Sequence, residues 1–316
     1  MIEYFKTVNG QVRPIDQFEQ GCWINLISPE HDELDEVAEL LGVVERDFLY
    51  AALDPEESSR VEIEEDETLI IVDIPTVDKG RENRDEDSIY ATIPMGIVVA
   101  GGTVVTVCLQ DTVILRSIAE NRVKNIQTNL RTRFVLQILL RDASMFLRNL
   151  RLIDRDFTRI EENLYESQRN SDLLQLLGLS KSLVYFSASL KANEVTMEKI
   201  LRGRVLKLYE DDRDLLEDAL IEIRQAIEMA NIYSSILADT MDAYASVVSN
   251  NLNDIMKVLA VVTIIMTIPN IIFGFYGMNI GADMGIPFAS FWWAPAFLAV
   301  IGCLVAWYIL KKKDLM

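Results

Sequence analysis

A stripe of small and polar side chains recurs along the C-terminal part of the chain in alternating steps of three and four residues. Steps of this kind place residues on one face of a helix. The stripe consists of Asp242, Ser246, Ser249, Asn253, Met256, Ala260, Thr263, Thr267 and Asn270. It enters a long apolar segment, where lipid would penalise the amide of Asn270 and disfavour that of Asn253 near the entrance. Such a face suits either one wall of an ion pathway or the close packing of membrane helices.

The length of the stripe favours the ion pathway. It continues from a charged helical region into the apolar segment, which is farther than packing alone explains. One copy of the helix supplies only one wall, so a pore would require an oligomer with closed symmetry. Close packing of small and polar residues between membrane helices stays open as the alternative.

A short motif, Tyr276-Gly277-Met278-Asn279, follows the stripe at the end of the apolar segment. Glycine can end a helix and let the backbone turn tightly. Asn279, repeated around a symmetry axis, would give a ring of carbonyl oxygens without fixed charge. Because Mg²⁺ holds its water shell tightly, such a ring could accept the hydrated ion through outer-shell hydrogen bonds. A plain glycine helix stop with Asn in the turn is the alternative.

Two apolar segments near the C-terminus are long enough to cross a membrane. Residues 255–276 contain one charge, Lys257, and residues 291–310 contain none. At about 1.5 Å per residue, each segment spans a hydrocarbon layer of about 30 Å. Aromatic residues flank the second segment as an interfacial belt would, namely Trp292, Trp293, Trp307 and Tyr308. Buried soluble helices are the less favoured alternative, because two such segments are adjacent.

The charges beside these segments predict their orientation. Lys311, Lys312 and Lys313 directly follow the second segment, whereas the loop 277–290 has Asp283 and no Lys or Arg. By the positive-inside rule, both termini are cytoplasmic and the loop faces outward. The N-terminus lacks the basic start and apolar core of a signal peptide. We therefore expect a multi-pass protein of the cell membrane.

The remainder of the sequence predicts an α+β protein in three parts. Residues 1–125 form a cytoplasmic α/β domain, 126–250 a helical region and stalk, and 251–316 a transmembrane hairpin. Strand signals occupy 22–27, 67–75 and 89–110, and helical periodicity occupies 31–43.

One helix could begin near Asp211 and continue unbroken to Tyr276, a length of about 65 residues. No proline occurs between Pro94 and Pro269 to interrupt its first part. A heptad seam on this stalk predicts packing against other helices. It comprises Leu216, Leu220, Ile223, Ile227, Ala230, Ser234, Leu237, Met241, Tyr244 and Val248.

The composition argues against several classes of function. The 316 residues carry 30 Lys and Arg against 49 Asp and Glu, a net charge of −19, so nucleic acid is not an expected partner. His31 is the only histidine, which argues against a His-rich zinc site and a Ser-His-Asp triad. The three cysteines are far apart and suit a reducing compartment. No phosphate-binding GxxxxGK[ST] loop is present, and we expect neither an enzyme nor an organic cofactor.

The motif in this position, after this stalk, resembles the CorA divalent-cation channels. Segments "WINL" (23–26), "RVEIEEDETLIIV" (60–72), "YASVVSNNLNDIMKVL" (244–259) and the hairpin resemble family segments in the expected order. The resemblance implies a funnel-shaped homopentamer in the lipid bilayer, with the stalk and first span of each subunit lining the pore. By this resemblance, the pore-lining positions are Asp242, Asn253, Met256, Thr267 and Asn270, and Asn279 lies in the external ring.

The resemblance also implies a basic ring and a regulatory metal site. Lys257 and Lys311 to Lys313 match basic residues around the family's pore mouth. Family channels are closed by Mg²⁺ bound between subunits, and Asp218 falls on one member of that acidic pair. Its partner position falls on Ala51, where Asp54 or Glu56 could substitute.

Two further departures concern the pore. The outer loop lacks the family's Met-Pro-Glu-Leu and has only Asp283 to attract cations. The family's membrane-embedded Thr is Asn270 here, and its neighbouring Met is Thr267. Met256 and Leu259 are then the remaining candidates for a gate that closes by dewetting.

Three functions therefore compete. We expect a passive Mg²⁺ channel, which could also pass Co²⁺ or Ni²⁺. A Zn²⁺ transporter resembling the ZntB branch is close to it, although no His or Cys lies in the stripe. A non-conducting, membrane-anchored coiled-coil scaffold would explain the heptad seam and the hairpin, but not the polar stripe.

Overall fold

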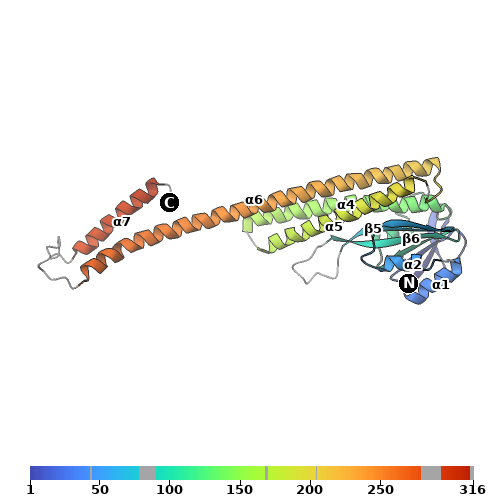
Figure 1. Ribbon diagram of the computed structural model, residues 1–316, viewed down its shortest axis with the longest axis horizontal. Coiled ribbons are helices and arrows are strands. Elements are labelled where there is room, and N and C mark those ends of the chain that lie inside the picture. The colour runs from blue at the N-terminus through green and yellow to red at the C-terminus, as the bar shows by residue number, and fades with distance from the viewer. Residues whose placement is uncertain (43–44, 78–89, 168–169, 204, 279–292, 314–316) are drawn as a thin grey trace. The chain divides into compact units, whose positions relative to one another are not determined.

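The computed structural model describes residues 1–42, 45–77, 90–167, 170–203, 205–278 and 293–313. The chain forms two compact units, Met1–Ala238 and Asp239–Met316. Helix α6 (Glu210–Tyr276) has residues in both units, and it begins and ends within one residue of the positions predicted from the sequence. The first unit contains the sheet and the long helices that the α+β prediction requires, so this part of the prediction is confirmed (Figure 1).

The first unit is built on a seven-stranded sheet with the strand order β2-β1-β3-β7-β6-β5-β4. Neighbouring strands are antiparallel except β3 and β7, which are parallel. The strands are β1 (Ile2–Val8), β2 (Gln11–Ile15), β3 (Trp23–Ile27), β4 (Arg60–Glu64), β5 (Glu67–Val77), β6 (Tyr90–Ala100) and β7 (Thr103–Cys108).

The apolar run predicted as one strand signal at 89–110 is a hairpin of β6 and β7. Gly101 and Gly102 form its two-residue turn with φ of 54° and 82°. Positive φ at both central residues matches the right-handed twist of the two strands, and glycine adopts it without steric cost. The Gly101-Gly102 pair is the sequence signal for this turn, since Gly-Gly between two apolar runs is typical of a hairpin.

Helical layers cover both faces of the sheet. One face carries α1 (His31–Leu41), α2 (Asp47–Tyr50) and the short 3₁₀ turn η1 (Ala51–Leu53). The other face carries α4 (Arg131–Ser167) and α5 (Asn170–Leu201), as Figure 1 shows. The side chains of successive strand residues therefore alternate between two buried layers, which explains why β5 and β7 are apolar almost throughout. Helix α3 (Val113–Ala119) follows β7.

The heptad seam of α6 is buried within the first unit. Leu216, Ile223 and Ala230 are 0% exposed, and Leu237 is 2% exposed. On α4, the Ser144 hydroxyl donates to the Glu222 carboxylate. On α5, Glu194 and Glu198 accept hydrogen bonds from the Arg224 guanidinium, both at 2.7 Å. The predicted packing of this seam against other helices is confirmed for residues 216–237.

The second unit is a hairpin of two helices, the C-terminal part of α6 and α7 (Ala294–Lys312). The contact between Gly302 and Ile268 is so close that a Cβ at Gly302 would lie 2.8 Å from Ile268 Cγ2. Close approach at glycine is typical of helix packing in membranes. The predicted second segment, 291–310, begins in residues outside the described part of the chain.

Within the described residues, three helices are long and apolar enough to cross a membrane: α5, α6 and α7. They differ in how much of that apolar surface the protein itself covers. In its most apolar 18-residue window α5 is 44% buried, whereas α6 is 6% and α7 is 17% buried. Packing on the sheet and on α4 therefore accounts for a substantial part of the apolar surface of α5, but the protein covers little of that of α6 and α7.

Candidate ion-conducting surface

The nine stripe residues are all exposed on α6. Helix α7 contacts the opposite face, where Val261 is buried and Ile265, Ile268 and Ile272 are half-buried. At about 100° per residue, the stripe lies on the far side of α6 from these residues. The stripe is thus left uncovered by the hairpin partner over its full membrane length.

Hydroxyl groups of the stripe are bonded to their own helix. Thr263 Oγ1 donates to the Leu259 carbonyl at 2.8 Å, and Thr267 Oγ1 donates to the Thr263 carbonyl at 2.7 Å. Ser246 Oγ makes the same bond to Asp242 O at 3.0 Å. Each hydroxyl oxygen keeps lone pairs that can accept a further hydrogen bond. Because the water hydrogens of a hydrated cation point outward, acceptors of this kind suit its outer shell.

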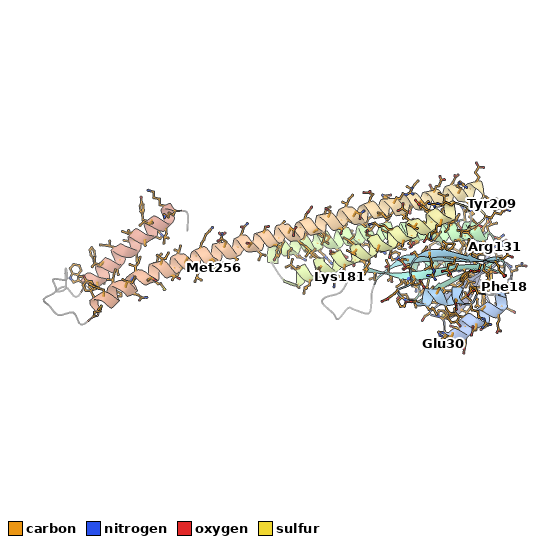
Figure 2. The ribbon with its side chains drawn as sticks, in the orientation of Figure 1. Phe18, Glu30, Arg131, Lys181, Tyr209 and Met256 are labelled. Carbon is orange, nitrogen blue, oxygen red and sulfur yellow. The ribbon has the colours of Figure 1, made fainter. Side chains whose placement is uncertain are left out.

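Met256 and Leu259, the predicted gate residues, are large apolar side chains near the entrance of the apolar segment. They are 55% and 56% exposed, and Figure 2 shows Met256 projecting from α6. Repeated around an axis, two such side chains would make an apolar constriction. The described geometry is therefore compatible with their predicted role as a dewetting gate, which stays a prediction.

The predicted outer motif coincides with the end of α6. Tyr276 is the last helical residue, and the Gly277 N–H donates to the Phe273 carbonyl at 2.8 Å. Gly277 does not adopt the positive φ expected for a tight glycine turn, although a Cβ there would lie 3.0 Å from Phe273 O. A side chain at this position would therefore crowd the last helical carbonyl, whereas the backbone conformation itself does not require glycine. Met278 is exposed, and Asn279 lies outside the described residues.

The predicted basic ring occupies one end of the hairpin. Lys257 Nζ pairs with Asp254 Oδ1 at 2.9 Å, and Lys311 Nζ lies 5.1 Å from the centre of the Trp307 ring. The antiparallel run of α7 places Lys311 at about the level of Lys257, since each is roughly two turns from the packing of α7 on Ile265. Lys312 and Lys313 are exposed at the same helix end.

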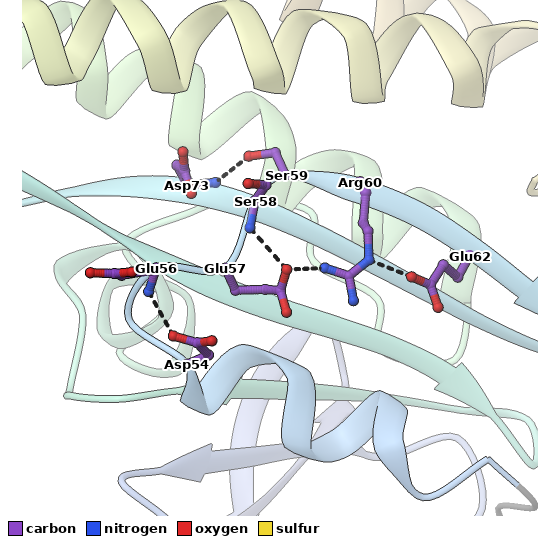
Figure 3. A network of polar contacts seen from close by, with 8 residues as sticks. All are labelled: Asp54, Glu56, Glu57, Ser58, Ser59, Arg60, Glu62 and Asp73. Carbon is purple, nitrogen blue, oxygen red and sulfur yellow. Dashed lines mark hydrogen bonds and ion pairs between the residues drawn. The ribbon is translucent and has the colours of Figure 1, made fainter.

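The predicted regulatory residues Asp54 and Asp218 are both exposed and lie on different elements. Asp54 follows η1 and accepts a hydrogen bond from the Glu56 backbone N–H at 2.9 Å (Figure 3). Among nearby acids, Glu57 and Glu62 are paired with Arg60. No cluster of three or more potential metal-ligating His, Cys, Asp or Glu occurs among the described residues.

The sequence did not predict a buried polar network that joins β5 to α4 and α5. Asn193 Nδ2 donates to the Asp73 carbonyl at 2.7 Å and to Asp142 Oδ2 at 3.1 Å. Asn193 Oδ1 accepts from Ser59 Oγ at 2.8 Å and from the Asp73 N–H at 2.9 Å. Figure 3 shows the Ser59–Asp73 side of this network. The one sequence signal is an Asp inside the apolar strand "LIIVDIP".

The two carboxyl groups of this network resist ionisation. Burial raises the pKa of Asp142 well above its usual range, and the nearby charge of Asp73 raises it further. Burial also raises the pKa of Asp73, against the opposing hydrogen bonds from Ser189 and Ser59. The network lies in the first unit and contains no stripe residue, so its evident role is to hold the sheet to the helices.

Comparisons with known proteins identify a family and several similar structures. The CorA-like Mg2+ transporter protein family matches residues 18–312. The cobalt/magnesium transport protein CorA of Methanocaldococcus jannaschii is 28% identical over 299 residues, 92% of this chain and 90% of that protein. The complete structure of the CorA magnesium transporter from the same organism has a TM-score of 0.84 and 25% identity, covering 100% of this chain and 99% of that one. The ZntB cytoplasmic domain from Vibrio parahaemolyticus shares the fold alone, with a TM-score of 0.61 and 12% identity over 78% of this chain and 98% of that one.

Proposed function

The chain belongs to the CorA-like Mg²⁺ transporter family, and we propose from this premise that it is a passive channel for hydrated Mg²⁺. Membership supports transport of divalent cations across a membrane, as do the cobalt/magnesium transport proteins among its relatives. The observation that carries the finer proposal is the uncovered stripe on α6, opposite the face that contacts α7. Co²⁺ and Ni²⁺ are further candidate ions.

The channel is proposed to be a homopentamer, in which five copies of α6 face a common axis. Closed symmetry is needed because one stripe is only one wall. In this arrangement residues 1–125 and 126–250 are cytoplasmic, residues 251–316 form two membrane spans, and loop 277–290 with Asn279 faces outward. The lysines at one end of the hairpin support this orientation by the positive-inside rule.

The membrane potential is a sufficient energy source for this transport. At about 100 mV, moving a divalent cation inward releases about 4.6 kcal/mol. The stripe hydroxyls would accept hydrogen bonds from the water shell of the ion, so Mg²⁺ need not lose its tightly held water. Asn253, Asn270 and Asn279 would add amide oxygens along the same path, and Asp242 would attract the cation at the cytoplasmic end.

Regulation by Mg²⁺ is proposed to involve Asp218 of one copy and Asp54 of a neighbour. Both carboxylates are exposed and therefore available to a second copy. Glu57 and Glu62 are less suitable, because both already pair with Arg60. A divalent ion between two copies would link the cytoplasmic concentration of Mg²⁺ to closure of the channel.

The experiment that tests the channel measures Mg²⁺ entry into proteoliposomes with a negative interior, using an internal dye. We expect influx in the wild type and its loss in Asn279→Ala. Thr267→Val should lower influx several-fold because it removes an acceptor without changing size, whereas the matched control Thr267→Ser should retain it. Equal influx in Thr267→Val and Thr267→Ser would contradict a role for the stripe hydroxyl.

Two other results would replace the proposal. Entry of Zn²⁺ without entry of Mg²⁺ would identify a Zn²⁺ transporter of the ZntB-like type, whose cytoplasmic domain shares the fold. A folded, inserted oligomer that passes neither ion would identify a scaffold, and the stripe would then serve helix packing.

A further inference from the structure

Pro269 interrupts the backbone hydrogen bonds of α6 within its membrane segment. Proline has no N–H, so the carbonyl four residues earlier, that of Ile265, loses its helical partner. In lipid, an unpaired carbonyl is costly because no water can replace the missing donor. The chain must therefore supply another donor to Ile265 or accept a distorted helix.

Helix α7 supplies that donor. The Cys303 thiol donates to the Ile265 carbonyl, with Sγ 3.6 Å from the oxygen. The neighbouring Gly302 lets α7 approach closely, since a Cβ there would lie 2.8 Å from Ile268 Cγ2. Three independent features thus meet at one level of the hairpin: a missing N–H, a thiol aimed at the released carbonyl, and a glycine at the closest approach.

The missing hydrogen bond at Pro269 lies on the helix face opposite the outer part of the stripe. Ile265 and Pro269 face α7, while Thr267 and Asn270, in the same stretch of α6, lie on the exposed face. A change in the direction of α6 at the unpaired carbonyl would move both stripe residues together. The contact that satisfies this carbonyl therefore also determines where Thr267 and Asn270 project.

We propose that Cys303 is a positioning residue of the ion pathway. Its thiol holds the Ile265 carbonyl that Pro269 releases, and so fixes the orientation of the stripe segment that contains Thr267 and Asn270. This inference rests on the proposed channel function for its consequence, but the thiol–carbonyl contact stands on the hairpin alone. The thiol bonds to Ile265, which is not a stripe residue, and in this proposal it does not touch the ion.

The contact is tested by infrared spectroscopy of the full-length protein in lipid. The S–H stretching band of Cys303 is obtained by subtracting the spectrum of Cys303→Ser from that of the wild type. The subtraction cancels the bands of Cys22 and Cys108, which both proteins contain. We expect the frequency of a hydrogen-bonded thiol. In Pro269→Ala the N–H of residue 269 competes for the Ile265 carbonyl, so the band should shift toward that of a free thiol. A frequency that is the same in wild type and Pro269→Ala overturns the inference.

The positioning role is tested by Mg²⁺ influx in the same proteoliposomes. We expect Cys303→Ala to lower influx several-fold and Cys303→Ser, which retains a donor, to stay within about twofold of wild type. In the Pro269→Ala background, Cys303→Ala should have no further effect, because Ile265 already has a partner. Val305→Ala, at an exposed position of α7, controls for loss of side-chain volume.

The outcomes separate the two proposals. A wild type that conducts, with Cys303→Ala equal to wild type, overturns the positioning role and leaves the channel intact. A wild type that passes no divalent cation overturns the channel, and with it the role of Cys303 in an ion pathway, whatever the infrared band shows. An equal loss of influx from Cys303→Ala with and without Pro269 also overturns the inference, because the effect would not act through the Ile265 carbonyl.

Discussion

Replacing Asp142 by Asn should stabilise the first unit near neutral pH and reduce the dependence of its stability on pH. The Asp142 side chain is fully buried, and Oδ2 accepts the hydrogen bond from Asn193. Oδ1 has no hydrogen-bond partner among the described residues. Asparagine has nearly the same shape as the protonated acid and keeps an acceptor for Asn193, but it carries no charge to desolvate.

The sign follows from the raised pKa of Asp142 in the folded state. An unfolded Asp releases its proton near pH 3.9, whereas burial and the charge of Asp73 keep the folded one protonated to higher pH. The contribution of Asp142 to stability is thus fully present below about pH 3.9 and is lost as pH rises through the folded pKa. Within that window one proton changes the free energy of unfolding by about 1.4 kcal/mol per pH unit. Asp142→Asn should remove this slope and leave the smaller, same-signed effect of Asp73.

The assay is denaturant unfolding of the full-length protein in detergent between pH 5 and pH 8. Trp23 is a suitable reporter, because it is 0% exposed and its indole N–H donates to Thr106 Oγ1 at 2.8 Å in the centre of the sheet. Replacing Trp292, Trp293 and Trp307 by Phe leaves Trp23 as the only tryptophan. Asp16→Asn, at an exposed position, is the matched control and should keep the wild-type slope.

Two results would refute this reasoning. Identical pH slopes in wild type and Asp142→Asn would show that Asp142 does not hold its proton in the folded state. A loss of about 1–3 kcal/mol at pH 7 would show that the ionised carboxylate makes an interaction that the amide cannot replace.

Two further predictions concern packing and regulation. Gly96→Ala should destabilise the first unit by about 1–3 kcal/mol, because its Cβ would lie 2.8 Å from Ala52 Cβ. The loss is measured from denaturant midpoints, and adding Ala52→Gly should recover most of it. A single variant as stable as the wild type would contradict the close contact. Asp218→Asn should raise the internal Mg²⁺ concentration that half-inhibits influx by about tenfold, equivalent to about 1.4 kcal/mol. Asp239→Asn, on the same helix, should leave that concentration unchanged, and an equal shift in both variants would argue for a general charge effect.

Elements with a strong periodic pattern were predictable from the sequence. The long helix was expected from near Asp211 to Tyr276 and is observed as Glu210–Tyr276, because a run without proline and with a continuous seam has few other ways to bury its apolar face. The helix expected at 31–43 ends at Leu41, where Gly42 adopts a φ of 65°. Strands β1 and β2 gave no comparable signal, since charged and polar residues interrupt their apolar pattern.

Contacts between residues far apart in the chain were not predictable in this way. Asp73, Asp142 and Asn193 form one network, yet no spacing rule relates a strand residue to residues on two separate helices. The same is true of Cys303 and Ile265, which are 38 positions apart. Pro269 indicated that a carbonyl would lack its partner, but only the packing of α7 shows which side chain replaces it.

The hydrogen bonds within the stripe also give it a preference for the sign of an ion's charge. The hydroxyls of Thr263 and Thr267 each donate their one proton to a carbonyl of α6. They have no proton left for a chloride or a phosphate, and present only negative partial charge. Around Thr263 and Thr267 the wall thus disfavours anions without an ionised group, so this part of the selectivity should persist across physiological pH and lose little to screening by salt.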